Sequence, residues 1–527
     1  MSNGGNRIFN VAGPCIPGEH YMLDPLRGIG DELTRLVDTK QYFVIHAARQ
    51  CGKTTLLKQL TRSINARGER YALYCSLEAV DGWTEPEKGV PAVIQQIELN
   101  IRNHGLPAGF AKDIDYSKTT VVLNEALTDY CRALDKPLII FFDEADCLSD
   151  MTLITFLRQL RNGYVNRGDV PFVHSVALVG MRNLRDYKVK ARGDSATLGS
   201  VSPFNIVKEA LSLRNFTKQD VAELYAQHTA ETGQVFERQA IDYAFEQTQG
   251  QPWLVNAIAC ECVEKVAKLD YTIPITRDMA ELAVQNIVLA HGTHFDSMVE
   301  RLKEERVRNV VGPLIIGEEV ANRRGEDYLY TRDLGIIRER DGKVEPANPI
   351  YAELIIRALN WDVQETIKSE HEEYVIPRYL KDGKIDMAFL MKDFQQYWRE
   401  NSEIWDDRYK KHYYEYDEYA THLVMQAFLQ RVINGGGQVI REMAFGKKRA
   451  DLCVVYNGQK YPIELKILQN MRGNAKGIEQ LLGYMDRIGS NTGWLVIFDK
   501  DTKKSWDEKI YLREETVGEK TVTVIGC

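Results

Sequence analysis

The stretch YFVIHAARQCGKTTLL, residues 42–57, runs from an apolar segment through a polar turn into an amphipathic segment. Residues 42–47 have the continuous apolar character of a buried strand, and the spacing from Thr54 to about Ile64 predicts a helix. The turn between them follows the pattern G-x-x-x-x-G-K-[ST], except that Ala47 replaces the first glycine. Such a turn directs backbone N–H groups and a helix N-terminus at phosphate groups. The stretch therefore predicts a phosphate-binding loop at the end of a buried strand.

Strands and helices alternate beyond this loop. The apolar patterns predict strands over residues 71–78, 137–143 and 172–180, and helices over residues 91–104, 119–134 and 152–166. This alternation predicts an α/β fold with a parallel sheet covered on both faces. The pattern is then helical from Thr217 to about Leu289, with an interruption at GQP, residues 250–252.

A second motif, IIFFDEAD at residues 139–146, ends a buried strand with acidic residues. Asp143 and the hydroxyl of Thr54 are expected to hold Mg²⁺, and Glu144 to polarise an attacking water. Lys53 is expected to reach the β- and γ-phosphates. The other residues of the loop that we expect to bind the nucleotide are Ala47, Arg49, Gln50, Cys51, Gly52 and Thr55. In GMRNLRD, Arg182 and Asn183 are candidates for sensing the γ-phosphate, although a solvated turn explains Arg182 and Arg185 equally well.

Residues 20–256 resemble the AAA-like, archaeal-ATPase and STAND branch of the P-loop NTPases. The resemblance lies in HYMLD, YFVIHAARQCGKTTLL, IIFFDEAD, VALVGMRNLRDY, LSLRNFTKQDVAELY and TQGQPWLVNAIA. It implies ATP as the nucleotide, a helical lid whose Gly250, Gln251 and Pro252 lie near that nucleotide, and a winged helix after the lid. An ordinary helix break is the alternative interpretation of GQP. An arginine acting across subunits would also require self-association.

The segment RADLCVVYNGQKYPIELKIL, residues 449–468, predicts a hairpin with charged residues in an apolar frame. Side chains alternate along a strand, so Glu464 and Lys466 share one face. Asp451 begins the preceding strand and can approach Glu464 across the hairpin. Two carboxylates at one place favour Mg²⁺, and a nearby lysine can orient water or a phosphate.

This D-x12-E-x-K pattern resembles the PD-(D/E)XK nuclease superfamily across roughly residues 415–500, with Ala450 where the name-giving proline would stand. The resemblance implies a metal-dependent nuclease that uses Mg²⁺, or Mn²⁺ in its place, at Asp451 and Glu464. Gln480 and Tyr484 match its Q-x-x-x-Y motif, and Glu418 is a candidate further acid. A surface ion pair between Glu464 and Lys466, or a nuclease fold without its chemistry, are the alternatives. Basic residues that suit a phosphate backbone surround the motif: Arg441, Lys447, Lys448, Arg449, Arg472 and Lys476.

The length of 527 residues predicts several domains. We expect an AAA-like ATPase domain at 1–215, a helical lid at 216–295, a winged helix with a DG-turned hairpin at 296–360, a linker at 361–410 and a nuclease-like domain at 411–527. The net charge of −8 leaves nucleic-acid binding to local basic patches. Nine scattered cysteines, no secretory leader and no membrane-spanning run predict a cytoplasmic protein without a membrane partner.

Two functions of different class follow from these motifs. The leading hypothesis is an ATPase whose nucleotide state regulates a metal-dependent nuclease acting on nucleic acid, with DNA as the expected substrate. The alternative is a nucleotide-dependent DNA-binding or signalling module whose nuclease-like domain does not cleave. Metal-dependent cleavage of DNA or RNA separates the two.

Overall fold

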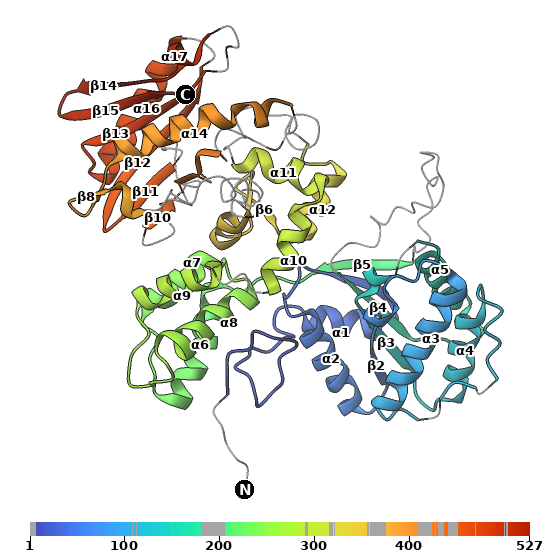
Figure 1. Ribbon diagram of the computed structural model, residues 1–527. Helices are drawn as coiled ribbons and strands as arrows, with labels where there is room; N and C mark the ends of the chain where they lie inside the picture. Colours follow the sequence, from blue (N-terminus) through green and yellow to red (C-terminus); the bar gives the residue numbers. More distant parts are fainter. Residues whose placement is uncertain are drawn as a thin grey trace. The chain divides into compact units, whose positions relative to one another are not determined.

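The computed structural model describes residues 7–107, 109–111, 113–148, 150–180, 206–289, 293–315, 320, 322–355, 358, 376–407, 424–426, 428–429, 437–440, 452–468, 471–499, 501 and 504–527. The chain divides into two compact units. Unit 1 comprises residues 1–293 and 323–351, and unit 2 comprises residues 294–322 and 352–527 (Figure 1).

Unit 1 is built on a five-stranded parallel sheet with the order β2-β3-β4-β1-β5. The strands are β1 (Tyr42–His46), β2 (Tyr71–Ser76), β3 (Leu138–Asp143), β4 (Ser175–Gly180) and β5 (Val207–Ser212). The prediction of a parallel sheet is therefore confirmed. Because β4 lies between β1 and β3, the loop after β1 and the acids after β3 meet at the carboxyl edge of the sheet from strands that are not neighbours.

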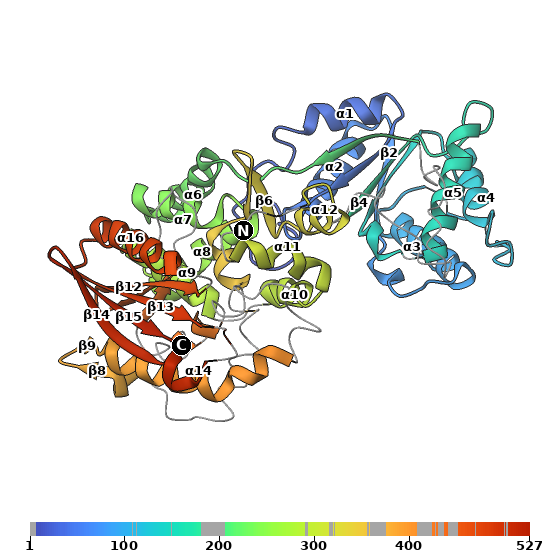
Figure 2. The ribbon, with the colours of Figure 1, turned by 90° about the horizontal axis from the view of Figure 1, so that it is seen from above.

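Helices cover both faces of this sheet (Figures 1 and 2). Alternate strand residues such as Phe43 and Phe141 pack on one side with α1 (Gly30–Asp38) and α2 (Lys53–Arg67). Their neighbours, such as Val44 and Phe142, pack on the other side with α3 (Pro86–Asn103), α4 (Val122–Ala133) and α5 (Asp150–Asn166). Short 3₁₀ helices follow β2 at Glu78–Val80 and β3 at Ala145–Cys147.

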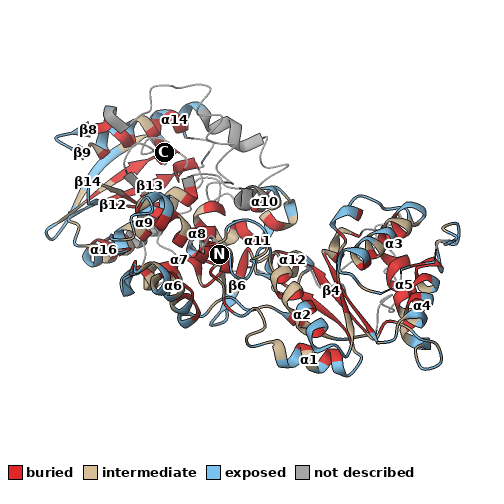
Figure 3. Cartoon of the chain, turned by 90° about the horizontal axis from the view of Figure 1, so that it is seen from below, coloured by how far each residue is buried: buried red, intermediate tan, exposed pale blue. Residues whose placement is uncertain are grey.

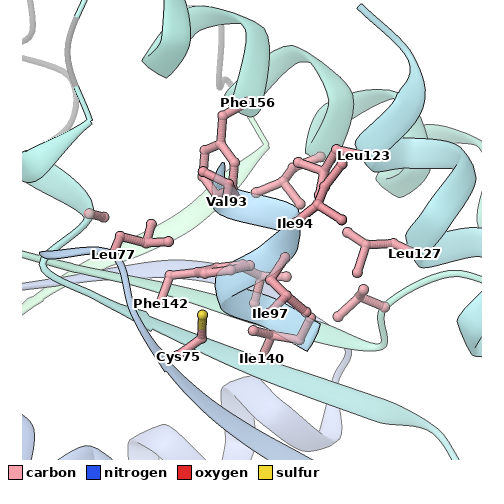
Figure 4. Packing of buried hydrophobic residues seen from close by; sticks show 14 of the residues in the cluster. Cys75, Leu77, Val93, Ile94, Ile97, Leu123, Leu127, Ile140, Phe142 and Phe156 are labelled. Atoms are coloured by element: carbon pink, nitrogen blue, oxygen red, sulfur yellow. The ribbon is translucent and has the colours of Figure 1, made fainter. Parts of the chain in front are cut away.

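The core on the α3 side shows how the sheet is held. Val93, Ile94 and Ile97 of α3 lie against Ile140 and Phe142 of β3 (Figure 4). All six residues of β4 are buried, as expected for a strand covered on both faces (Figure 3). The rigid layer that results fixes the strand ends from which the site is built.

Two elements of this domain were not predicted. The edge strand β5 has the sequence VKEALS, which contains no continuous apolar run. Only Leu211 of this strand is buried, so the other positions do not need apolar side chains. Helix α1 is short, and its N-cap, Ile29, makes no side-chain capping bond. Both elements depend on contacts with the rest of the sheet more than on a local signal.

The region after β5 is helical, as predicted. It contains α6 (Lys218–Thr232), α7 (Arg238–Thr248), α8 (Pro252–Cys260), a π-helical turn (Glu261–Val266) and α9 (Arg277–Leu289). Helix α6 begins with a capping box between Thr217 and Asp220. Farther along, α12 (Glu326–Asp333) precedes the hairpin of β6 (Ile337–Arg340) and β7 (Lys343–Pro346). Asp341 and Gly342 turn it with positive φ angles of 50° and 72°, so the predicted DG hairpin is confirmed.

Unit 2 contains α11 (Glu305–Ile315), nearly all of α10 (Thr293–Leu302) and a six-stranded mixed sheet with the order β10-β11-β12-β13-β15-β14. Its strands are β10 (Gly437–Ile440), β11 (Leu452–Tyr456), β12 (Gln459–Ile467), β13 (Thr492–Phe498), β14 (Tyr511–Val517) and β15 (Lys520–Gly526). The pair β12 and β13 is parallel, as is β13 and β15, whereas the outer pairs are antiparallel. The predicted winged-helix range is divided between the two units, so its boundaries stay a prediction.

Helices also cover both faces of the second sheet. Ile463 and Leu465 of β12 pack with α14 (Met387–Asp407). Leu495 and Ile497 of β13 point to the opposite face and pack with α16 (Met471–Ile488). A 3₁₀ turn (Ile376–Tyr379), the short hairpin of β8 (Leu380–Lys381) and β9 (Lys384–Ile385), and α17 (Trp506–Lys509) complete this domain.

The predicted linker over residues 361–410 is corrected for its described part. Tyr379, Ile385 and the α14 residues Leu390, Phe394 and Tyr397 are buried in the core of the second sheet. The apolar residues of α14 recur at helical spacing, but charged residues between them obscure the pattern. Residues 376–407 therefore form one face of this domain. Among the described residues, no helix has the length and apolar character needed to cross a membrane.

Candidate functional site

The loop after β1 has the backbone geometry that its sequence suggests. Gly52 has φ +89° and Gln50 has φ +58°, whereas Ala47 is not among the residues with positive φ. Gly52 is also the N-cap of α2, so the helix begins directly at Lys53. The replacement of the first glycine by Ala47 therefore introduces no backbone strain.

Lys53 is held by the loop itself. Its side chain is 6% exposed, and Nζ donates hydrogen bonds of 3.0 Å to the carbonyl oxygens of both Ala47 and Ala48. A buried ammonium needs acceptors, and here backbone oxygens provide them. The cation thus sits at the start of α2, where helix N–H groups also favour an anion.

Asp143 lies at the end of β3 and is 1% exposed, and both oxygens of its carboxylate accept hydrogen bonds. Its Oδ2 accepts hydrogen bonds from the hydroxyls of Thr54 at 2.7 Å and Tyr74 at 3.0 Å, and its Oδ1 accepts one from the backbone N–H of Glu144 at 3.1 Å. The predicted pair of Thr54 and Asp143 is therefore in contact. Tyr74 was not predicted; it lies on β2 directly beside β3, and only the pairing of these two strands could have indicated it.

Glu144 follows Asp143 in a left-handed conformation with φ +53°. A non-glycine residue in this region is strained, and such strain is concentrated at functional sites. Burial raises the pKa of its carboxyl, and the negative charge of Asp143 raises it further. A carboxylate with a raised pKa is suited to accept a proton.

The helical region reaches the loop through GQP. The Nε2 atom of Gln251 lies 3.5 Å from the carbonyl oxygens of both Arg49 and Gln50, while its Oε1 accepts a hydrogen bond of 2.6 Å from the N–H of Leu254. Pro252 is the first residue of α8. The motif is thus more than a helix break, because it joins α8 to the loop.

The segment beyond the helical region also contacts the loop. Gly335, between α12 and β6, has φ +75°, and a Cβ added there would lie 2.3 Å from Cβ of Ala48. Arg338 of β6 donates a hydrogen bond of 2.8 Å to the side chain of Gln249. Elements on both sides of α9 in the sequence therefore touch the loop region.

A cavity of about 330 Å³ opens beside the loop. Thr55 lines it, and its Oγ1 accepts a hydrogen bond of 3.1 Å from the N–H of Cys15. Cys51 also lines it, and burial raises the pKa of that thiol. The other walls come from the segment before α1, from β5 and its connection to α6, and from α8; they include Tyr21, Met22, Leu23, Leu211, Leu213, Phe216, Pro252 and Asn256.

Comparison with known proteins fits this geometry. Residues 35–187 match the family described as AAA domain. This part of the chain is an AAA-like P-loop ATPase domain. Similar solved structures include a Walker-type ATPase of Pyrococcus abyssi (14% identity, 66% of this chain and 99% of that chain, TM-score 0.46), Cdc6p of Pyrobaculum aerophilum (13%, 64% and 95%, 0.36) and the RuvB Holliday junction branch migration motor of Thermotoga maritima (12%, 62% and 93%, 0.34). No curated protein matches the chain.

The ATPase domain takes ATP as its substrate, and the assignment rests on the family match together with the loop and the acidic strand. Of the predicted nucleotide ligands, Lys53, Thr54, Asp143 and Glu144 lie together at one sheet edge. Arg182, Asn183 and Arg185 lie outside the described residues.

A second cluster lies in unit 2, on the face of the sheet that α16 covers. Glu464 of β12 is 1% exposed, and its Oε1 lies 2.8 Å from Nζ of Lys466, which is 27% exposed. Helix α16 approaches closely here, because a Cβ added to Gly477 would lie 3.2 Å from Cγ of Lys466. Glu464 and Lys466 therefore share a face, as predicted, and that face is covered by a helix.

Gln480 and Tyr484 lie on α16 above the same sheet. The Oε1 atom of Gln480 is buried without a hydrogen-bond partner among the described residues. Tyr484 is buried with Cys453 of β11. Asp451 and Glu418 lie outside the described residues, as do Arg441, Lys447, Lys448 and Arg449, while Arg472 and Lys476 belong to α16.

Proposed function

We propose that this protein is an ATPase whose nucleotide state regulates a metal-dependent nuclease in the same chain, with DNA as the substrate. The proposal has two parts, the roles of residues at the ATPase loop and the activity of the second cluster. The observation that carries the second part is a buried carboxylate, Glu464, paired with Lys466 on the sheet face that α16 covers. Gln480 of that helix has an amide oxygen that is buried without a hydrogen-bond partner among the described residues.

At the ATPase loop, Lys53 is ready to exchange partners. Its two carbonyl acceptors belong to the loop, so the oxygens of the β- and γ-phosphates can replace them without an unpaired charge at any stage. Ala47, Arg49, Gln50, Cys51, Gly52 and Thr55 form the rest of the nucleotide-binding loop in this proposal, with Pro252 and Arg182 as contacts from outside it.

The Thr54 hydroxyl and the Asp143 carboxylate fit Mg²⁺, because they are oxygen donors only 2.7 Å apart at the base of the loop. When bound there, the ion supplies charge neutralisation for the phosphates. Tyr74 keeps its own bond to Asp143 and so holds that carboxylate in orientation. Glu144 then accepts the proton of the attacking water, and its raised pKa suits it to that role.

In unit 2, we propose Asp451, Glu464 and Lys466 as the nuclease centre, with Gln480 and Tyr484 as positioning residues. Leu452, the residue after Asp451, pairs with Ile463, the residue before Glu464. The ionised oxygens of the two acids suit Mg²⁺ or Mn²⁺, which supplies an activated water and stabilises charge on the phosphate. Lys466 donates to Glu464 and can turn its ammonium toward a phosphate oxygen.

Regulation follows from what touches the loop. Gln251 of α8 and Gly335 before β6 both lie against loop residues. A γ-phosphate that reshapes the loop therefore changes the contacts of the helical region and of the β6–β7 segment. Arg182 acting in trans would add self-association, which sizing of the ATP-bound protein tests.

The experiment uses the full chain with single- and double-stranded DNA and RNA, Mg²⁺ or Mn²⁺, and presence or absence of ATP. Lys466→Ala is compared with Lys460→Ala, an exposed lysine on the same strand. Lys53→Ala is compared with Arg62→Ala, an exposed cation on the same helix. We expect cleavage that Lys466→Ala abolishes and Lys460→Ala keeps, and a dependence on ATP that Lys53→Ala removes.

Cleavage by Lys466→Ala at the parental rate would show that the nuclease centre is misassigned. ATP binding without cleavage of any substrate would favour the alternative, a nucleotide-dependent binding or signalling module.

A further inference from the structure

The sheet of unit 2 ends in a strand whose outer edge has no partner strand. β14 is the last strand in the order β10-β11-β12-β13-β15-β14, and among the described residues it pairs with β15 alone (Figure 1). An edge strand presents a row of backbone N–H and C=O groups that another strand can bind. A further strand can therefore add to the sheet at β14.

The hydrogen bonds of β15 determine which backbone groups of β14 are free. Thr521 of β15 donates its N–H to the carbonyl oxygen of Asn491, on the β13 side. Backbone groups alternate in direction along a strand, so those of the next residue, Val522, point to β14, where Val522 pairs with Glu515. The same alternation along β14 directs the N–H and C=O groups of its even-numbered residues away from β15: Leu512, Glu514 and Thr516.

The side chains at this edge are apolar or oppositely charged. Arg513 and Glu515 lie on one face of the sheet and form an ion pair of 2.9 Å, in which they stay 52% and 35% exposed. Leu512 and Val517 are each 45% exposed although both are large and apolar. Beside Leu512, a hollow of about 580 Å³ is lined by residues of β14 and of the start of α14, including Phe389. The edge thus combines free backbone groups, exposed apolar side chains and charges of both signs.

We infer that β14 pairs antiparallel with β14 of a second copy of this chain, so that the two sheets join into one. A two-fold axis at Glu514 places Arg513 of each copy opposite Glu515 of the other, and Tyr511 of each copy opposite Val517 of the other. These are non-hydrogen-bonded pairs, in which side chains approach most closely. Positive and negative charges then alternate around the four positions, so every neighbouring pair attracts.

The charges also select the register of this pairing. Outward-pointing residues must stand opposite one another, so the nearest other two-fold registers are centred on Arg513 or on Glu515. Each of these sets two like charges opposite each other and forms no Arg–Glu pair between the copies. The register centred on Glu514 has one like-charge contact, between the two copies of Glu514, but it gains two pairs of opposite charge. We therefore expect a reversible dimer that a change at Glu514 strengthens.

The inference goes beyond the proposed function and depends on neither the ATPase site nor the nuclease centre. It is tested by sedimentation velocity of the full chain without nucleotide, over a series of protein concentrations. The parent should pass from monomer to dimer as the concentration rises. Association through the ATPase domain would instead respond to ATP, so the same series is repeated with ATP.

Charge reversal tests the contacts between the two strands. Arg513→Glu turns two attractive pairs into two repulsive pairs and should raise the dissociation constant of the dimer at least about tenfold. The double variant Arg513→Glu with Glu515→Arg exchanges the signs within each pair and should return the constant to within about threefold of the parent. Lys384→Glu makes the same charge change at an exposed lysine of β9 and should leave the dimer unchanged.

Changes at the centre of β14 test the backbone pairing. Glu514→Gln removes the like-charge contact and should tighten the dimer about 2- to 5-fold. Glu514→Pro removes an N–H that the sheet of one copy does not use, so it should abolish the dimer while circular dichroism and thermal unfolding show a folded protein. With glutathione disulfide as oxidant, Glu514→Cys should cross-link to its own second copy. Thr516→Cys should not, because its second copy lies four residues along the partner strand, about 13 Å away.

Three results would overturn the inference. The first is a parent that stays monomeric throughout the series. The second is a dimer that Arg513→Glu and Glu514→Pro both leave unchanged, because the contact would then lie elsewhere on the chain. The third is self-association that appears only with ATP, which would belong to the ATPase domain. A dimer that Arg513→Glu weakens but that Glu514→Cys does not cross-link would contradict the register centred on Glu514.

Discussion

Lys53 in the ATPase domain and Lys466 in unit 2 hold their charges in different ways. Lys53 is bonded to two backbone carbonyls, which are neutral and belong to the loop it serves. Lys466 lies against the carboxylate of Glu464, a formal charge of opposite sign. Backbone acceptors are exchanged for phosphate at little cost, whereas an ion pair must be opened before either partner can serve a ligand.

The difference extends to the acids. Asp143 accepts hydrogen bonds from two hydroxyls and one backbone N–H, all from neutral groups, so its negative charge is kept for a cation. The charge of Glu464 is partly compensated by its lysine. We therefore expect the ATPase site to hold its metal more tightly than the site in unit 2, and four predictions test or sharpen this contrast.

The largest effect is expected from Glu144→Gln. An isosteric amide cannot accept the proton, so steady-state ATP hydrolysis should fall by about 10²- to 10⁴-fold while ATP binding is retained. Glu78→Gln, an exposed acid just after β2, should hydrolyse ATP at nearly the parental rate. Hydrolysis by Glu144→Gln within a factor of three of the parent would remove Glu144 from the mechanism.

Lys466→Met should destabilise unit 2 more than Lys53→Met destabilises the ATPase domain. The first change leaves the Glu464 carboxylate buried without its lysine, at a cost of about 1–3 kcal/mol, whereas the second frees only two carbonyls. Denaturant unfolding measures both. The double variant Glu464→Gln with Lys466→Met should recover part of the loss, and Lys460→Met should change little. If the losses of unfolding free energy in the single variants Glu464→Gln and Lys466→Met add up to the loss in the double variant, the two groups do not interact.

The ATPase domain could be predicted from sequence because its signals are local. The loop, the acidic strand and each single apolar run occupy fewer than twenty residues, and backbone geometry supplies much of the site. Tyr74 could not be predicted, because its contact with Asp143 depends on the pairing of β2 with β3.

The site in unit 2 is harder to predict from the sequence, because it too depends on contacts between elements that are distant in the chain. The shared face of Glu464 and Lys466 follows from strand alternation alone, but its burial depends on α16, whose close approach at Gly477 is a tertiary feature. The sequence predicts a linker over residues 361–410 because charged residues in α14 conceal the spacing of Leu390, Phe394 and Tyr397, which pack on the other face of the sheet. Charge content describes the exposed side of a helix and says little of its buried side.

Tyr74→Phe should give a smaller effect that isolates the orientation of Asp143. It removes one of three donors to that carboxylate, so the Mg²⁺ concentration for half-maximal ATP binding should rise about 2- to 10-fold, the range expected for one hydrogen bond. Tyr71→Phe removes a hydroxyl from the same strand that bonds to Asp135 instead, and should leave the Mg²⁺ dependence unchanged. A shift in nucleotide affinity without Mg²⁺ would instead indicate a general disturbance of the loop.

The smallest effect concerns the acid limb of the pH–rate profile. Glu144 must be ionised to accept a proton, and its pKa is raised by burial first and then by Asp143, with Glu78 among the lesser contributors. ATP hydrolysis should therefore decline, as the pH falls, at a higher pH than an ordinary glutamate would give. Removing a negative charge favours the ionised form, so Glu78→Gln should move this limb to lower pH. The contrary result is an acid limb that lies at the same pH in the parent, in Glu78→Gln and in the residual activity of Glu144→Gln. In that case a group other than Glu144 causes the loss of activity at low pH, and the raised pKa of Glu144 does not affect the rate.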